Sequence, residues 1–414
     1  MKHAHARVTR PTASRLWSRA ASAAAIVAVA ATTTTLSGIA QAQPGTPPEP
    51  ATPTPQTPTP ASSPVPDPTP NSTPNKVDPL EAPLPTSAQN NIAEGEMTPE
   101  LDRAVEQGLR ALAAMQNDDN SFGEARWGRS VAITALACLA FMSDGNLPGR
   151  GQYGDVVERG LQFVLSNCAE NGLIAAEAAN GPMYGHGFAA LFLGEIYGMT
   201  AGAAEGTKEA RLAAQVHEAV VKAVRLIQAT QNEEGGWRYN PVPFDADVSV
   251  TICQIMALRS ARNAGLEVPK ETIDRAVAYV RKCQNEDGGF KYQLQSGPSG
   301  WERSAAGIAS LFYAGIYEDQ AIDQGLRYLM NTGLPGRAVR RSHYYYGHYY
   351  GVQAMYLAGG AHWQTWWPAI REELIANQRP AGEWDDQSVG SAYGTSMALI
   401  ILQMPKRYLP IFQK

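Results

Sequence analysis

The sequence predicts an all-α fold in which six helical hairpins close into a ring, an α/α toroid spanning residues 97–414. From residue 97 onward, apolar side chains recur about every 3.6 residues, the spacing of helices, and alternating strand patterns are nearly absent. A similar pair of helices recurs about every 50 residues. A turn of constant length follows four of the six first helices. Repeated hairpins that bury their apolar faces against one another favour a closed ring.

The first 42 residues have the three parts of a secretory signal peptide. Lys2 and four arginines precede an apolar run at 20–31, and Ala40-Gln41-Ala42 provides an A-x-A cleavage site. A membrane span needs about 20 apolar residues, and this run is shorter. An uncleaved anchor is therefore the less favoured alternative. We expect cleavage after Ala42 and export to a periplasm or the extracellular space.

Residues 43–96 form a segment rich in Pro, Thr and Ser with few aliphatic side chains. Such a segment buries too little apolar surface to fold, so we expect a disordered, partly polyproline linker. The linker would hold the folded domain near a membrane or cell wall. The net charge of −5, without a basic block beyond the signal peptide, argues against a nucleic-acid partner.

The two helices of each repeat differ in pattern. First helices carry charge on one face, as expected of an outer ring, and second helices are apolar nearly all round, as expected of an inner ring. The inner helices should all point their N-termini at one mouth of the ring. Aligned by sequence, their first residues are Arg129, His186, Asp247, Arg303, His348 and Tyr393.

The turn of constant length runs from a glutamine to an aromatic residue six positions later. It occurs at Gln116 and Phe122, Gln231 and Trp237, Gln284 and Phe290, and Gln378 and Trp384; repeats two and five lack it. Glycines inside the turn supply positive backbone angles. The glutamine amide can satisfy backbone groups at a helix end, and the ring can pack on the next hairpin.

The four cysteines leave two interpretations open. Export permits disulfides, and Cys138, Cys168, Cys253 and Cys283 allow three pairings. Each lies in an apolar helical run, which equally indicates small buried side chains. Their spacing does not indicate a zinc site.

The glutamine-to-aromatic turns resemble the QW repeats of squalene-hopene cyclases. The wider group is the terpenoid cyclase and protein prenyltransferase superfamily, and the resemblance covers about residues 100–414. It implies an α/α toroid. No Asp-x-Cys zinc element of the prenyltransferases, no aspartate-rich magnesium motif and no Gly-Cys-Gly-Glu-Gln thioester motif is found in the chain, so we expect no cofactor.

The catalytic motif of these cyclases, D-x-D-D-T, is similar to Asp245-Ala246-Asp247-Val248-Ser249. The resemblance makes Asp247 the acid that protonates the substrate and Asp245 the neighbour that orients it. Val248 replaces the third acid, and Ser249 replaces the threonine. The alternative for Asp247 is a helix cap, which accepts backbone N–H groups and would lower its pKa.

Other candidate residues belong to the same mouth. His348 can tune the acidity of Asp247, or join His186 and a carboxylate around a metal, whereas each histidine alone is equally a buried structural residue. Charged residues there can bind an anion or pair with the aspartates, but structural ion pairs are the favoured interpretation. A dense set of aromatic residues favours a ligand pocket. The proposed lining is His186, Arg129, Arg303, Glu302, Trp301, Tyr346, Tyr349 and Tyr393.

Three functions follow as hypotheses. The first is an enzyme of the terpene-cyclase type, with Asp247 as acid acting on an apolar substrate in the ring. The second is a non-catalytic ring that binds a lipid, a peptide or a protein. The third is a glycan-active toroid, which needs two facing carboxylates, and the candidate pairs are Asp247 with Glu302 or with Asp386.

Overall fold

The computed structural model describes residues 95–176, 181–200, 202, 204–336 and 342–413. The predicted signal peptide at 1–42 and all but the last two residues of the predicted linker at 43–96 lie outside this part of the chain.

Within the described ranges the chain is helical, and its only β-structure consists of isolated bridges. The α-helices are α1 (Pro99–Ala113), α2 (Val131–Met142), α3 (Gly154–Ser166), α4 (Met183–Thr200), α5 (Lys208–Ala229), α6 (Val248–Asn263), α7 (Lys270–Lys282), α8 (Trp301–Tyr313), α9 (Gln320–Gly333), α10 (Tyr344–Ala358), α11 (Gly360–Asn377) and α12 (Ser391–Leu402). Three 3-10 helices accompany them: η1 (Ala125–Trp127), η2 (Met404–Lys406) and η3 (Pro410–Phe412).

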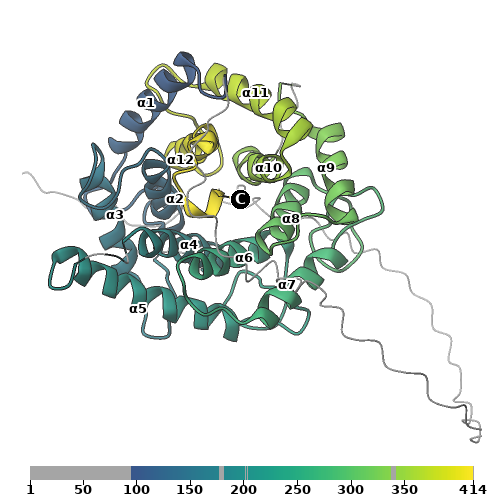
Figure 1. Cartoon of the computed structure of the whole chain (residues 1–414), viewed down its shortest axis with the longest axis horizontal. Helices are drawn as coiled ribbons and strands as arrows, with labels where there is room; N and C mark the ends of the chain where they lie inside the picture. The colour runs from purple at the N-terminus through teal and green to yellow at the C-terminus, as the bar shows by residue number, and fades with distance from the viewer. Residues whose placement is uncertain (1–94, 177–180, 201, 203, 337–341, 414) are drawn as a thin grey trace, which may run out of the picture. The chain divides into compact units, whose positions relative to one another are not determined.

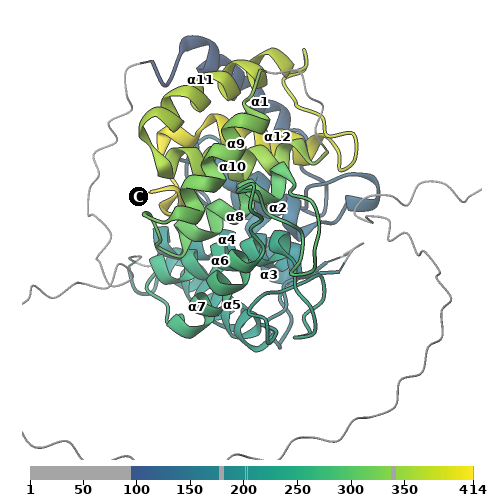
Figure 2. The same ribbon diagram turned by 90° about the vertical axis from the view of Figure 1, so that its right-hand side faces the viewer.

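The helices form two concentric rings (Figure 1). Odd-numbered helices lie outside and even-numbered helices inside, and each inner helix packs against the next. The ring closes because α12 packs against both α1 and α2. Seen from the side, α5 and α7 lie at the edge opposite α1 and α11 (Figure 2). The predicted all-α toroid is confirmed.

The sequence pattern explains which helices lie inside. In α2 every residue but Ala132 is buried, because it contacts helices on all sides. In α1 the buried residues form one stripe that includes Leu101, Val105 and Leu112, while Glu100 and Asp102 remain on the outer side. Since outer and inner helices alternate along the chain, all inner helices run in the same direction and share one N-terminal mouth.

The glutamine-to-aromatic turns join successive outer helices. The Gln231 amide donates to Gly235 O at 2.8 Å and to Thr272 O, in α7, at 2.9 Å. The Gln378 amide makes the corresponding bond to Ala104 O, in α1, at 2.9 Å. That last bond ties the sixth hairpin to the first.

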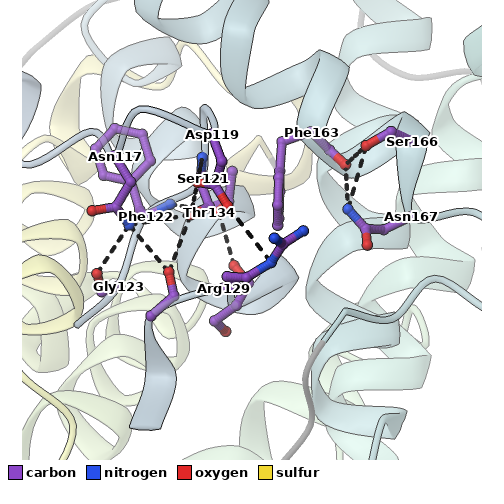
Figure 3. Close-up of polar contacts among 12 residues, drawn as sticks. Asn117, Asp119, Ser121, Phe122, Gly123, Arg129, Thr134, Phe163, Ser166 and Asn167 are labelled. Carbon is purple, nitrogen blue, oxygen red and sulfur yellow. Dashed lines mark hydrogen bonds and ion pairs between the residues drawn. The ribbon is translucent and has the colours of Figure 1, made fainter. Parts of the chain in front are cut away.

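A second hydrogen bond anchors each turn to its inner helix. In the first repeat the Phe122 backbone N–H donates to Thr134 Oγ1 at 2.9 Å (Figure 3). Trp237 N–H donates to Thr251 Oγ1 in the same way, at 3.1 Å. In repeat two the donor is Ile174 N–H and the acceptor is His186 Nδ1, at 3.1 Å.

Repeat two therefore keeps the turn without its usual residues. Cys168 stands in the place of the glutamine and Ile174 in the place of the aromatic, and a bridge joins them as one joins Gln284 to Phe290. The sequence motif was correctly found missing there, but the local structure is the same.

The C-terminal segment closes the end of the ring opposite the N-terminal mouth. The helix η3 packs against α4 and α6, and Figure 1 shows the C-terminus near the ring axis. Ile411 and Phe412 are buried there, and Ile411 N–H donates to Glu195 Oε2 at 3.0 Å. Ser260 Oγ donates to Glu195 Oε1 at 2.6 Å, so both carboxyl oxygens are bonded.

All four cysteines are unpaired, and three of them are fully buried. The structure thus follows the interpretation of small apolar side chains rather than any disulfide pairing.

Among the described residues, no helix combines the length and apolarity that crossing a bilayer would require.

Candidate functional site

Asp247 begins the inner helix α6 as its N-cap. Its Oδ1 accepts the backbone N–H of Val250 at 2.9 Å, and its own N–H donates to Trp237 O at 3.0 Å. The cap fixes the carboxylate at the mouth end of α6. The residue is 0 % exposed, so the second oxygen, Oδ2, is sealed from water. The predicted capping role is confirmed.

The acidity of Asp247 differs from that of an ordinary helix cap. Burial raises the pKa of Asp247 to about 7, although the Val250 N–H and the Arg238 charge both lower it. Capping was expected to leave a low pKa, but the loss of hydration outweighs the backbone N–H groups, the nearby Arg238 charge and the Tyr292 hydroxyl. A carboxyl group with this pKa can donate a proton near neutral pH.

Arg238 lies between the two aspartates. Its guanidinium forms a hydrogen-bonded ion pair with Asp245, while its Nε stays 3.8 Å from Asp247 Oδ2. Both the Arg238 Nε and the Asp247 Oδ2 are buried and lack a hydrogen-bond partner among the described residues. Asp245 was predicted to orient Asp247 directly, but its bond goes to Arg238 instead.

Tyrosines from four segments surround Asp247. Tyr239 and Tyr292 follow the turns of repeats three and four and share a hydrogen bond between their hydroxyls. Tyr184, in α4, packs 6.0 Å from the Tyr239 ring, and Tyr346, in α10, donates to Ser249 O at 3.2 Å. The Tyr292 hydroxyl lowers the pKa of Asp247 without a hydrogen bond of regular geometry.

Four of these residues were not identified as site residues from the sequence: Arg238, Tyr184, Tyr239 and Tyr292. A signal for two of them is present. Tyr239 follows Trp237 by two positions, and Tyr292 follows Phe290 by the same two positions. The repeat therefore places a phenol beside the mouth twice, and the two hydroxyls meet.

Aromatic side chains also cross the interior of the ring below Asp247. The Tyr349 ring, from α10, meets the Phe188 ring, from α4, with centroids 6.1 Å apart. These two helices lie on opposite sides of the inner ring (Figure 1). The Tyr350 hydroxyl lies 3.3 Å from Cys253 Sγ of α6. Tyr346 and Tyr349 were predicted to line a cavity, and in the structure they lie in the packed interior of the ring. Tyr349 also lies near enough to Tyr393 to raise the pKa of the Tyr393 hydroxyl.

The two histidines lie one helical turn deeper than the sequence alignment assumed. His186 stands at the position of Thr134 and Thr251, where it accepts a turn N–H. Burial lowers its pKa to about 4, which keeps it neutral. His348 packs between aromatic rings of α8, α10 and α11, 4.8 Å from the Trp301 ring and 4.4 Å from the Tyr344 ring. These contacts are those of structural histidines, so the alignment that put both beside Asp247 is wrong.

Trp301 also faces away from the interior. Its indole stacks on Trp366 of α11, with centroids 5.8 Å apart, and its Nε1 donates to Leu329 O of α9 at 3.3 Å. It fills the space between the inner and outer rings, so its predicted place in the lining is wrong.

The charged residues predicted at the mouth pair with neighbours rather than with Asp247. Arg129 is half-exposed and lies 3.5 Å from Asp119, over the Phe163 ring (Figure 3). Arg303 pairs with Glu302 at 3.1 Å. The structure therefore gives these three residues surface or rim roles.

The loop before Asp245 carries an apolar tip. Phe244 is 85 % exposed and Val242 is 52 % exposed, and their backbone N–H groups bond to Val242 O and Asn240 O within the same loop. Two hollows on the described surface lie elsewhere, beside α9 and between α3 and α5. Asp247 itself is closed off from solvent, since it is 0 % exposed. No cluster of three potential metal ligands occurs among the described residues.

Known proteins share parts of the sequence and the fold. No family model matches the chain. Over 212 residues it is 27% identical to a drimenyl diphosphate synthase of Streptomyces showdoensis, a stretch that covers 50% of this chain and 36% of that protein. The chain thus spans little more than a third of this relative's length.

Solved structures of several activities have the same fold. A variant of the type II terpene cyclase MstE from Scytonema, in complex with geranylgeranyl dihydroxybenzoate, matches with a TM-score of 0.52 at 14% identity. The match covers 75% of this chain and 98% of that one. The GH76A alpha-1,6-mannanase from Salegentibacter matches with a TM-score of 0.55 at 8% identity, over 73% of this chain and 98% of the mannanase.

A cellobiose 2-epimerase from Bacillus thermoamylovorans also matches, with a TM-score of 0.55 at 11% identity, over 74% of this chain and 98% of the epimerase. At such identities the likeness concerns the fold alone. The sequence match to a terpene synthase and the structural match to a terpene cyclase agree with each other. The chain has a terpene-cyclase-like helical toroid.

Proposed function

We propose that this protein is a terpene-cyclase-like isomerase or lyase in which Asp247 protonates an apolar, isoprenoid substrate. The observation that carries the proposal is the state of Asp247. It is a buried carboxyl group with a pKa of about 7, held by a helix N-terminus, with one oxygen unpaired and tyrosine rings around it.

The chemistry follows from this arrangement. Asp247 transfers its proton to one carbon of a trisubstituted alkene, and the alkene's π electrons form the new C–H bond. The adjacent carbon becomes a tertiary carbocation, which the next alkene of the chain attacks to close a ring. The last cation loses a proton to water, so the product is an isomer of the substrate. Asp247, left as a carboxylate, takes a proton back from water before the next turnover.

The tyrosines would stabilise the cation. The faces of aromatic rings attract positive charge by about 0.5–2 kcal/mol each, more when water is excluded. Tyr184 and Tyr346 are buried near Asp247, and the Tyr350 ring packs on Tyr346 with centroids 4.9 Å apart, so these rings are available to the cation. The apolar tip at Phe244 gives the mouth a surface suited to an isoprenoid chain. We propose that its loop moves when the closed site opens.

A non-catalytic binding ring is the second candidate, and the filled interior favours it. The contact between Phe188 and Tyr349 leaves room for a long ligand only if side chains move. The glycan-active alternative has less support. Glu302 pairs with Arg303, and Asp386 accepts backbone N–H groups from Ser388 and Val389.

A turnover assay tests the proposal. The purified chain is incubated with linear C15 and C20 isoprenoid alcohols and diphosphates, and products of unchanged mass but altered retention are sought by gas chromatography and mass spectrometry. We expect cyclic isomers, and their loss in Asp247→Asn. The control is Asp385→Asn, which removes a carboxylate paired with Arg379 at another turn.

Two results would contradict the proposal. One is identical product formation by Asp247→Asn. The other is binding of the same isoprenoids, followed by thermal shift, without any product from the unaltered protein, which would support the binding ring.

We also propose export through the signal peptide at 1–42 to a periplasm or the extracellular space, tested by fusing these residues to a reporter active only outside the cytosol.

A further inference from the structure

Arg238 lies beside the buried carboxyl group of Asp247 without forming a hydrogen bond to it, and this is unusual. A guanidinium next to a buried carboxyl group normally forms a close ion pair and holds the group ionised. Here the Nε of Arg238 and the Oδ2 of Asp247 face each other at 3.8 Å, beyond hydrogen-bond distance, and both lack another partner among the described residues.

The reason for the gap is Asp245. Its carboxylate accepts a hydrogen bond from Arg238 Nη1, so the guanidinium is drawn away from Asp247. The faces of two tyrosine rings fix it from the sides, with the guanidinium carbon 5.2 Å from the Tyr239 centroid and 5.9 Å from the Tyr292 centroid. Closing on Asp247 would require Arg238 to leave Asp245.

We propose that Asp245 and Arg238 are a pair of positioning residues: Asp245 holds the guanidinium off Asp247 and so leaves Asp247 Oδ2 unpaired for its ligand. The inference deepens the proposed function, because an acid catalyst needs that oxygen free. It assigns to Asp245 an action through Arg238 rather than through direct contact.

The other groups around Asp247 leave Arg238 as the decisive charge. Tyr239 and Tyr292 face it from the loops after α5 and α7, Tyr184 from α4, and Tyr346 from α10, while Cys253 follows on α6. Tyr279 in α7 and Cys283 at its C-cap also interact with Asp247. Burial raises the pKa of each of these tyrosines and of both thiols, so all are neutral at physiological pH. Arg238 is the cation that acts on Asp247 among the described residues.

The test follows the titration of Asp247 without relying on catalysis. The free energy of unfolding of the full chain is measured by urea titration at a series of pH values. For each protein the measurement is repeated with Asp247→Asn added, and the second curve is subtracted from the first. The difference changes with pH only between the pKa of Asp247 in the unfolded chain and its pKa in the folded protein. The pH of the upper bend, where the slope has fallen to half its maximum, is the apparent pKa of Asp247 in the folded protein, and we call this pH the midpoint. Four backgrounds are compared: unaltered, Asp245→Asn, Arg238→Gln, and both together.

We expect Asp245→Asn to move the midpoint down by about one pH unit, a tenfold change in proton affinity, because Arg238 then closes on Asp247. Arg238→Gln should move it up. In the Arg238→Gln background, Asp245→Asn should lose most of its effect, since its action passes through the arginine. The control Asp385→Asn breaks a similar pair with Arg379 and should leave the midpoint unchanged.

The proposal is overturned if Asp245→Asn leaves the midpoint in place or raises it. It is equally overturned if the full downward shift persists without Arg238, since Asp245 would then act by its own charge. If Arg238→Gln does not fold, Arg238→Lys serves instead, and the effect of Asp245→Asn should shrink because lysine lacks the Nε–H. A protein with no cyclase activity can still give the expected shifts, so failure of the proposed function remains distinguishable.

Discussion

Replacing Asp247 with asparagine should change how the stability of the fold depends on pH. Asparagine keeps the size of the side chain and an oxygen that can accept the Val250 N–H at the helix N-terminus. It removes the group that titrates. The comparison therefore isolates the proton of Asp247 from its role as a helix cap.

The magnitude follows from the shift in pKa. The pKa of Asp247 rises from the ordinary 3.8 to about 7, because the buried carboxylate has lost its hydration. At about 1.4 kcal/mol for each tenfold change in the proton equilibrium, this corresponds to about 4 kcal/mol in total. Between about pH 5 and about pH 8 the expected change is about 2.5 kcal/mol.

The sign is that of a raised pKa. Below the pKa of the unfolded chain both states are protonated, and the folded state has its full stability. As pH rises toward 7 the unfolded chain releases its proton first, so stability contributed by Asp247 falls and is lost once pH passes the folded pKa. Asp247→Asn should therefore gain stability relative to the unaltered protein as pH increases.

The assay is urea unfolding followed by tryptophan fluorescence and circular dichroism at several pH values. Subtracting the two proteins is necessary because other buried groups titrate too. Burial lowers the pKa of His186 to about 4 and raises that of Glu195 to about 7, and both contributions cancel in the difference. The free energy of unfolding of Asp247→Asn minus that of the unaltered protein should rise with pH. A flat difference would refute the reasoning, since Asp247 would then ionise like an exposed aspartate. A difference that falls with pH would also refute it, since folding would then lower the pKa of Asp247.

Three further changes test the ring itself. Gly235→Ala should destabilise by a few kcal/mol in urea unfolding, because the glycine has φ of +101° and a Cβ there would lie 2.2 Å from Arg275 O; wild-type stability would contradict this. Thr251→Val should cost about 1–3 kcal/mol by leaving the Trp237 N–H buried without its acceptor, and Thr251→Ser should restore most of it. The unaltered protein should lose up to about 3 kcal/mol of stability as pH rises through 7, because Glu195 ionises there, and Glu195→Gln should abolish this loss. Thermal midpoints at about pH 5 and pH 8 measure the effect; an unchanged pH dependence in the variant would count against it.

The fold was predictable because its signals are local and repeated. Helical periodicity separates outer from inner helices, and each glutamine amide bonds the next outer helix as the turn pattern suggested. Ring closure was inferred from the repeats and is carried by one more bond of the same kind, from Gln378 to Ala104. Each step needed only residues near one another in sequence.

The site was less predictable, because its residues meet only after closure. Asp247 was found through its motif, but its pKa depends on burial, which the sequence does not state. His186 and His348 were aligned with Asp247 by their place near a helix start, and an error of one turn placed them in the packing between the rings. Arg238 was missed because an arginine after a tryptophan carries no signal until Asp245 is seen beside it.

The bond between Gln378 and Ala104 leaves the array of hairpins with no terminal member. An open row of repeats can fray from either end, since an end unit detaches by giving up one neighbour. In this closed circle every hairpin is held on two flanks, so the first to leave must break both contacts together. Such a structure resists piecemeal opening and should lose its architecture in a single concerted event.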